Sequence, residues 1–153
     1  MDLNAELKDT LSRTADWLAD TRDPWWILGS AAIALIGVNL NGVRDIDVLV
    51  SEQDARDLMT RHRLENQSDG GTERYHSNTF LLPELGPYRV EVMAGYKIRR
   101  NDEWENVWPR TRVAAEVAGS ILWVPEAGEQ IDILRRLNRP KDRSRIELIK
   151  TTI

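Results

Sequence analysis

The pattern of apolar and polar positions divides the chain into a succession of helices and strands. Over residues 4–19, leucine and alanine recur at three- and four-residue steps with charged residues between them, a pattern typical of an amphipathic helix. The short apolar run at 25–28 predicts a buried strand, and it ends at a Gly29-Ser30 turn. We expect Ser30 to cap a short buried helix over residues 31–36.

The rest of the chain continues this alternation of elements. The run 45–50 predicts a strand, and Ser51 then caps a second amphipathic helix that ends near His62. The polar stretch 66–72 predicts an exposed loop. The remaining predicted elements are strands at 75–82 and 88–93 joined by a hairpin, a β-rich stretch at 112–124 that breaks at Gly119-Ser120, and helices at 126–138 and 140–149.

Length and composition fit one globular domain. The 153 residues are 41% hydrophobic and 30% charged, which excludes a disordered chain. We find neither an internal repeat nor a linker, so we predict a single domain over residues 1–153. The absence of cysteine excludes disulfides, thiolate zinc sites and cysteine nucleophiles.

Charge and hydropathy limit the partners and the compartment. A net charge of −4 argues against bulk binding of DNA or of anionic lipid. The start of the chain lacks the positive residues of a signal peptide, and its longest apolar run, residues 31–37, is far shorter than the ~20 residues that span a bilayer. We therefore expect a cytoplasmic protein that does not enter membranes.

Two aspartates on one strand are the first candidate for chemistry. Asp45 and Asp47 are two residues apart, so their side chains leave the same face of the strand while Ile46 and Val48 leave the other. Two carboxylates held together repel each other unless a cation or a basic partner neutralises them. Carboxylate oxygens are hard ligands that favour Mg²⁺ or Mn²⁺.

A third carboxylate and a turn complete the candidate site. The alternation in Arg89-Val90-Glu91-Val92-Met93 turns the valines to the core and Glu91 to the opposite face. If this strand lies beside the strand of Asp45 and Asp47, the three carboxylates converge. The Gly29-Ser30 turn would add backbone N–H groups and a hydroxyl, which suit a phosphate group.

These motifs, in this order, resemble those of the DNA polymerase β-like nucleotidyltransferase superfamily. The matching segments are Leu28-Gly29-Ser30-Ala31, Asp45-Ile46-Asp47-Val48, Val90-Glu91-Val92 and, later, Arg139-Pro140-Lys141-Asp142-Arg143. The last segment is similar to one that opens a C-terminal helix in small bacterial members related to nucleotidyltransferase toxins and antibiotic nucleotidyltransferases. The resemblance implies an α/β (α+β) fold, with a mixed β-sheet and flanking helices.

The resemblance also implies a reaction and roles for its residues. A nucleoside monophosphate would pass from a nucleoside triphosphate to a hydroxyl of an acceptor, which is a small molecule, an RNA or a protein. Asp45, Asp47 and Glu91 would be catalytic and would bind Mg²⁺ or Mn²⁺, and Glu91 would help to activate the acceptor hydroxyl.

Nucleotide-binding roles follow from the same resemblance. Gly29 and Ser30 would hold the triphosphate, and Lys141 is the best single candidate for a further contact with the nucleotide. Lys141 belongs to a basic stretch, residues 135–150, which otherwise reads as a solvated helix pair.

Simpler interpretations stay open beside these. The aspartates could pair with Arg44 or Arg89, and Glu91 could be a surface residue paired with Arg89 or Lys97. The chain could be a catalytically silent member that binds a nucleotide or a partner, or a metal-dependent phosphoesterase of another family. Trp104 and Trp108 lie in a charged segment that we expect to be a loop, and they could either stack on a base or sugar or pack in the core. His76 could act as a base or could be a packed or surface histidine.

Overall fold

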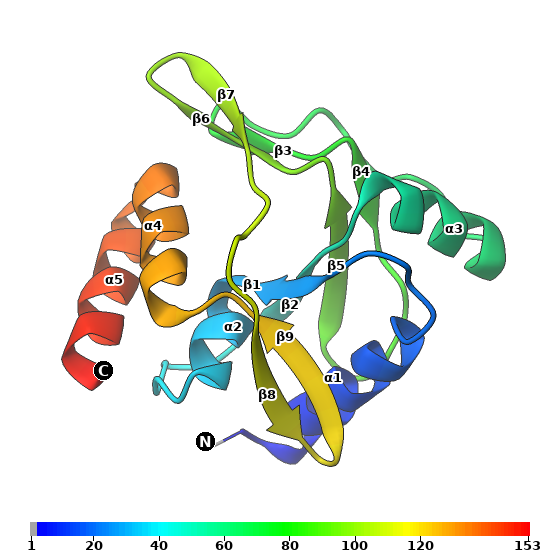
Figure 1. Ribbon diagram of the computed structural model, residues 1–153, viewed down its shortest axis with the longest axis horizontal. Helices are drawn as coiled ribbons and strands as arrows, with labels where there is room; N and C mark the ends of the chain where they lie inside the picture. The colour runs from blue at the N-terminus through cyan, green and yellow to red at the C-terminus, as the bar shows by residue number, and fades with distance from the viewer. Residues whose placement is uncertain (1–2) are drawn as a thin grey trace.

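A computed structural model describes residues 3–153 and places a mixed four-stranded sheet at the centre of the molecule (Figure 1). Its strands, in spatial order, are β1 (Trp26–Leu28), β2 (Asp45–Leu49), β5 (Arg89–Ala94) and β4 (Thr79–Leu81). β2 and β5 are parallel, whereas β1 and β4 pair antiparallel at the two edges. The expected mixed sheet with flanking helices is confirmed.

The main core lies between one face of this sheet and two helices. These helices are α1 (Ala5–Trp17) and α3 (Glu52–His62), and a hairpin of β8 (Val113–Val117) and β9 (Ser120–Val124) completes the layer. Both helices begin with a side-chain cap, and the cap of α3 is the predicted Ser51. The Leu7 N–H donates to Asn4 Oδ1 at 2.8 Å, and the Asp54 N–H donates to Ser51 Oγ at 3.1 Å.

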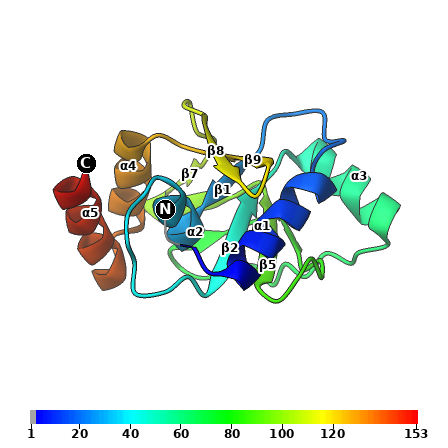
Figure 2. The same cartoon turned by 90° about the horizontal axis from the view of Figure 1, so that it is seen from below.

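The opposite face of the sheet is covered by segments from the middle and the end of the chain. They are α4 (Ala127–Leu137) and a second sheet of β3 (Tyr75–His76), β6 (Lys97–Arg100) and β7 (Glu103–Asn106). The helix α2 (Gly29–Leu35) contributes to the main core on one side and packs against α4 and α5 (Pro140–Thr152) on the other. Figure 2 shows α4 and α5 on one side of the molecule and α1 and α3 on the other. Among residues 3–153, no helix combines the length and the apolar character needed to cross a bilayer.

Three local predictions are wrong. The predicted single strand 75–82 is divided into β3 and β4, because β3 pairs with β6 while β4 pairs with β5 in the other sheet. The charged segment around Trp104 is not a loop but the β6–β7 hairpin. Ser30 is not the cap of α2, because the helix already begins at Gly29, whose positive φ of +67° makes the tight turn out of β1.

Candidate functional site

The parallel pairing of β2 with β5 brings the acidic residues onto neighbouring strands. In its register Asp47 lies opposite Glu91, and Asp45 lies two pairs away, opposite Arg89. Ile46 and Val48 on β2 are fully buried in the main core, while the acidic side chains on the other face are partly exposed. The alternation predicted from the sequence is confirmed for both strands.

All the residues singled out as a candidate site line one pocket of about 480 Å³. The central sheet and the turn after β1 supply one side of it: Asp45, Asp47, Glu91, Gly29 and Ser30. The helix α5 supplies Lys141 on another side. The structure therefore brings these six residues together, although the first, Gly29, and the last, Lys141, are far apart in the sequence.

Gly29 holds the turn against the acidic strand. The antiparallel pairing of β1 with β2 sets Leu28 opposite Asp47, so the following residue lies over the aspartate side chain. A Cβ atom on Gly29 would be 2.6 Å from Oδ2 of Asp47. No larger residue fits there without displacing that carboxylate, and the positive φ of Gly29 disfavours other residues as well.

The electrostatics of the pocket centre on Asp47. Burial, together with the negative charges of Asp45 and Glu91, raises the pKa of Asp47 from 3.8 to about 7, and the charges of Arg145 and Lys141 oppose that rise. At Asp47 itself, burial and the two acidic neighbours therefore outweigh the basic residues of α5. A cation bound among these carboxylates would relieve the repulsion.

The donor set fits a hard divalent cation, since it consists of carboxylate oxygens. In residues 3–153, however, no three acidic, histidine or cysteine side chains stand close enough together to hold a metal ion as they are. Glu91 accepts a hydrogen bond from Arg89 Nε at 2.9 Å, which is the surface ion pair that the sequence left open. Asp45 and Asp47 could hold such a cation, and Glu91 could join them on releasing Arg89.

Basic residues of α5 line the pocket beside the acidic strands. Arg139 and Arg145 accompany Lys141 in its lining. Burial lowers the pKa of Lys141, and the neighbouring charges of Arg139 and Arg145 lower it further. Asp142, which is fully buried, fixes Arg139 by accepting hydrogen bonds from its Nε at 2.7 Å and its Nη2 at 3.0 Å. The start of α5 is thus a rigid, positively charged edge of the pocket.

The sequence did not predict the side of the pocket that lies opposite the acidic strands. The sequence predicts the loop 66–72 only as exposed, yet several of its residues line the pocket. Tyr75 and Tyr96 form an edge-to-face pair there, with ring centroids 6.4 Å apart. Burial and then the charge of Asp47 raise the pKa of Tyr96, so its phenol stays protonated. The sequence carried no signal for these positions, because their place depends on how β3 and β6 pack over the central sheet.

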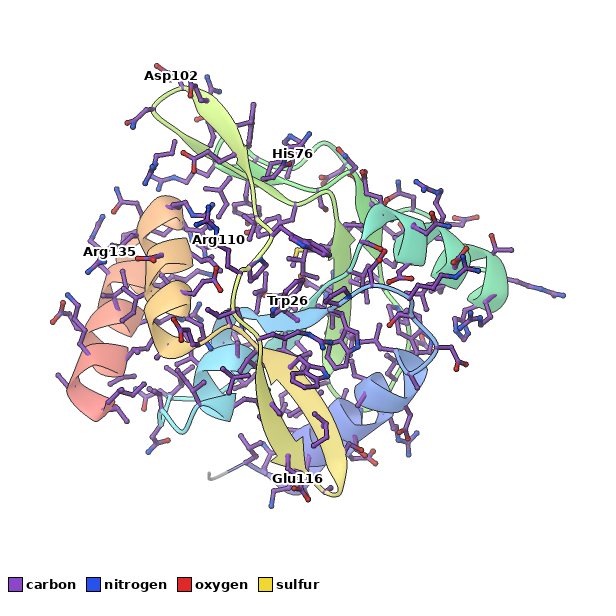
Figure 3. All side chains as sticks on the ribbon, viewed as in Figure 1. Trp26, His76, Asp102, Arg110, Glu116 and Arg135 are labelled. Atoms are coloured by element: carbon purple, nitrogen blue, oxygen red, sulfur yellow. The ribbon has the colours of Figure 1, made fainter. Side chains whose placement is uncertain are left out.

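The three aromatic residues whose roles were left open have packing partners. Trp104 on β7 lies edge-on to His76, with centroids 4.5 Å apart, and Trp108 lies edge-on to Trp26 at 4.7 Å. Figure 3 labels His76, which is on β3, and Trp26, which is on β1. The lining of the pocket, taken from residues 3–153, includes His76 but neither Trp104 nor Trp108.

Comparison with known proteins gives structural likenesses alone. No protein-family model and no curated protein matches the sequence. A Thermotoga maritima protein described as a candidate nucleotidyltransferase has a similar structure, with a TM-score of 0.77, 21% identity, and coverage of 99% of this chain and 97% of that one.

Two antibiotic-modifying proteins are also similar in structure. ANT(2″)-Ia in complex with adenylyl-2″-tobramycin matches with a TM-score of 0.54 and 17% identity, over 92% of this chain and 85% of that one. The lincosamide antibiotic adenylyltransferase LnuA, bound to lincomycin, matches with a TM-score of 0.61 and 11% identity, over 94% and 96%. At these identities the likenesses establish a shared fold.

Proposed function

We propose, on the premise that the chain has the nucleotidyltransferase fold, that it transfers a nucleoside monophosphate from a nucleoside triphosphate to an acceptor hydroxyl. One observation carries the proposal: the acidic residues of β2 and β5 line the same pocket as the Gly29 turn and the basic start of α5. Acidic side chains would bind the cation, and the turn and the basic side chains beside them would bind the triphosphate.

Asp45, Asp47 and Glu91 would hold Mg²⁺ or Mn²⁺. Such an ion supplies charge neutralisation at the reacting phosphate and lowers the pKa of a bound hydroxyl. The pKa of Asp47, raised by burial and by its two acidic neighbours, supports this assignment, since an added cation would reverse that effect.

The triphosphate would lie between the turn and α5. Gly29 leaves its backbone free to approach the phosphates, and Ser30 adds a hydroxyl at the same turn. Lys141 and Arg145 would neutralise phosphate charge from the other side of the pocket. Both basic residues already act electrostatically on Asp47, which supports their closeness to the acidic strands.

The transfer exchanges one phosphorus–oxygen bond for another. The acceptor oxygen bonds to the α-phosphorus, the bond from that phosphorus to the bridging oxygen breaks, and pyrophosphate leaves with the electron pair. Glu91, once released from Arg89, is the candidate to take the proton of the acceptor hydroxyl. The acceptor class stays open among a small molecule, an RNA and a protein. We expect the protein to act in the cytoplasm, where nucleoside triphosphates are available.

The test is transfer of label from each nucleoside triphosphate, with Mg²⁺, to acceptors in a cell extract. We expect label from the α-phosphate to appear on an acceptor and label from the γ-phosphate to appear in pyrophosphate. Asp47→Asn should abolish both. A nucleoside triphosphate with Mg²⁺ should also raise the melting temperature more than either alone. Absence of any shift with purine and pyrimidine nucleotides would contradict nucleotide binding.

A catalytically silent nucleotide-binding protein is the second candidate. The ion pair of Arg89 with Glu91 favours it, because that pair occupies the third carboxylate. This candidate predicts the same nucleotide-dependent thermal shift without transfer of label. Release of product from a phosphodiester without any nucleoside triphosphate would instead identify a phosphoesterase.

A further inference from the structure

Tyr96 is held firmly in the connection between β5 and β6. Its main-chain oxygen accepts a hydrogen bond from the Val107 N–H at 2.9 Å. The residue is 9% exposed, and its side chain belongs to an apolar cluster with Ile98, Ile133 and Leu137. The main chain and the ring of Tyr96 are therefore fixed by the fold, which leaves its hydroxyl group to be accounted for.

This hydroxyl opens into the pocket. In residues 3–153, the one side-chain polar atom that lacks both a hydrogen-bond partner and access to solvent is Oε1 of Gln130. The hydroxyl of Tyr96 has no partner among these residues either, so it must be accessible, and Tyr96 lines the pocket. A donor that the fold leaves unpaired at the wall of a pocket is available to a ligand.

Opposite charges act on this donor. Burial raises the pKa of Tyr96, the negative charge of Asp47 raises it further, and the positive charge of Arg139 lowers it. Both charged residues line the same pocket, and the buried Asp142 fixes Arg139 there. A ligand that binds both a cation held by Asp47 and the guanidinium of Arg139 is an anion, so it offers acceptor oxygens to a phenol that stays protonated.

We propose that Tyr96 contacts the triphosphate, with its hydroxyl donating a hydrogen bond to a phosphate oxygen between Asp47 and Arg139. The inference rests on the proposed function and adds a residue to it. Tyr96 lies outside the four segments that resemble the superfamily, so the resemblance does not supply this contact. The apolar cluster around the ring sets the position of the hydroxyl.

Titration calorimetry of Tyr96→Phe tests the proposal, with Mg²⁺ and each of ATP, GTP, CTP and UTP. We expect the variant to bind the nucleotide about tenfold to a hundredfold more weakly than the wild type, the size of a hydrogen bond to a charged acceptor. The loss should be the same for the 2′,3′-dideoxy analogue of that nucleotide, which keeps the phosphates and lacks both ribose hydroxyls.

Two controls separate a phosphate contact from other roles. Tyr88→Phe is the same substitution at a tyrosine that packs against the main core and whose hydroxyl accepts a hydrogen bond from Asn4 Nδ2 at 2.8 Å. It should bind the nucleotide as the wild type does. Without ligand, Tyr96→Phe should melt at the wild-type temperature or above, because a hydroxyl without a partner adds no bond to the fold. Its affinity for Mn²⁺ alone should be unchanged.

Four results would overturn the inference. Equal nucleotide affinity of Tyr96→Phe and the wild type would show that the hydroxyl meets no ligand. A marked fall in melting temperature would make it a structural group, and a fall in Mn²⁺ affinity would show that it acts through the acidic residues. A loss that disappears with the dideoxy analogue would assign the contact to the ribose.

Failure of all four nucleotides to bind the wild type would contradict the proposed function itself, and the inference with it. The other results leave nucleotide binding by the wild type intact, so the two failures are distinguishable.

Discussion

Gly29 and Asp47 approach each other so closely that a Cβ atom on Gly29 would lie 2.6 Å from Oδ2 of Asp47. The turn that follows β1 therefore rests directly on the carboxylate that the neighbouring strand presents to the pocket. This contact links the glycine of the turn to the geometry of the acidic cluster. The loss in free energy of unfolding when Gly29 is substituted measures how tight this contact is.

Gly29→Ala should lower the free energy of unfolding by more than Gly37→Ala. Both glycines have positive φ, +67° and +91°, so both substitutions introduce backbone strain of about 1 kcal/mol. Only position 29 adds a collision, because nothing lies within 4 Å of a Cβ at Gly37. Urea unfolding of the two variants measures the difference. Equal losses would mean that the Asp47 side chain moves aside freely.

Asp47→Asn should stabilise the metal-free protein in a pH-dependent way. The folded-state pKa of about 7 lies above the ordinary 3.8, so folding favours the protonated carboxyl. The stability that Asp47 contributes is complete below about pH 4 and is lost as the pH rises through about 7. We expect little difference between variant and wild type at about pH 4 and a gain on the order of 1–2 kcal/mol at about pH 8.

The measurement is urea unfolding across this pH range in the presence of a chelator. Asp132→Asn serves as the control, because that carboxylate is exposed on α4, with 70% of its side chain accessible. Its difference from the wild type should stay small at every pH. A marked loss of stability in Asp47→Asn would instead identify Asp47 as a structural ion-pair partner and would remove the main support for a metal site.

Arg89→Gln should tighten binding of Mn²⁺. The substitution frees Glu91 from its ion pair and removes a positive charge from the pocket lining, so we expect a gain of about threefold to tenfold, measured by calorimetry. Arg100→Gln is the control, since it breaks the comparable 3.1 Å pair with Glu105 on the second sheet. The gain should vanish when Arg89→Gln is made in a Glu91→Gln background. A gain that persists there would show that Glu91 is not a ligand.

Asp142→Ala should destabilise the protein by about 3 kcal/mol, because it leaves Arg139 without its partner and removes an acceptor for the Arg139 N–H at the start of α5. Asp142 is fully buried, unlike the exposed pair of Glu147 with Lys150 on the same helix. Glu147→Gln is therefore the control, with an expected change below about 0.5 kcal/mol. Thermal and urea unfolding check both values. Similar small changes would show that α5 is anchored by its apolar contacts alone.

The sequence by itself determined which residues face the pocket on each strand. Side chains alternate along a strand, so Asp45 and Asp47 had to share a face opposite Ile46, whatever the strand packed against. The same local rules placed the cap Ser51, because a cap bonds to a backbone group only a few residues away. The sheet class followed from the resemblance of the ordered motifs.

The tertiary structure alone decided which of these faces meet. Nothing local in the chain set Glu91 opposite Asp47 or brought Lys141 of α5 to the same pocket as the acidic strands. The division of residues 75–81 between two sheets had the same origin. Local periodicity fixes the direction of a side chain relative to its own strand or helix. The residue that it meets across a pocket depends on how segments far apart in the sequence pack together, and the pattern of apolar and polar residues in a single sequence does not specify that packing.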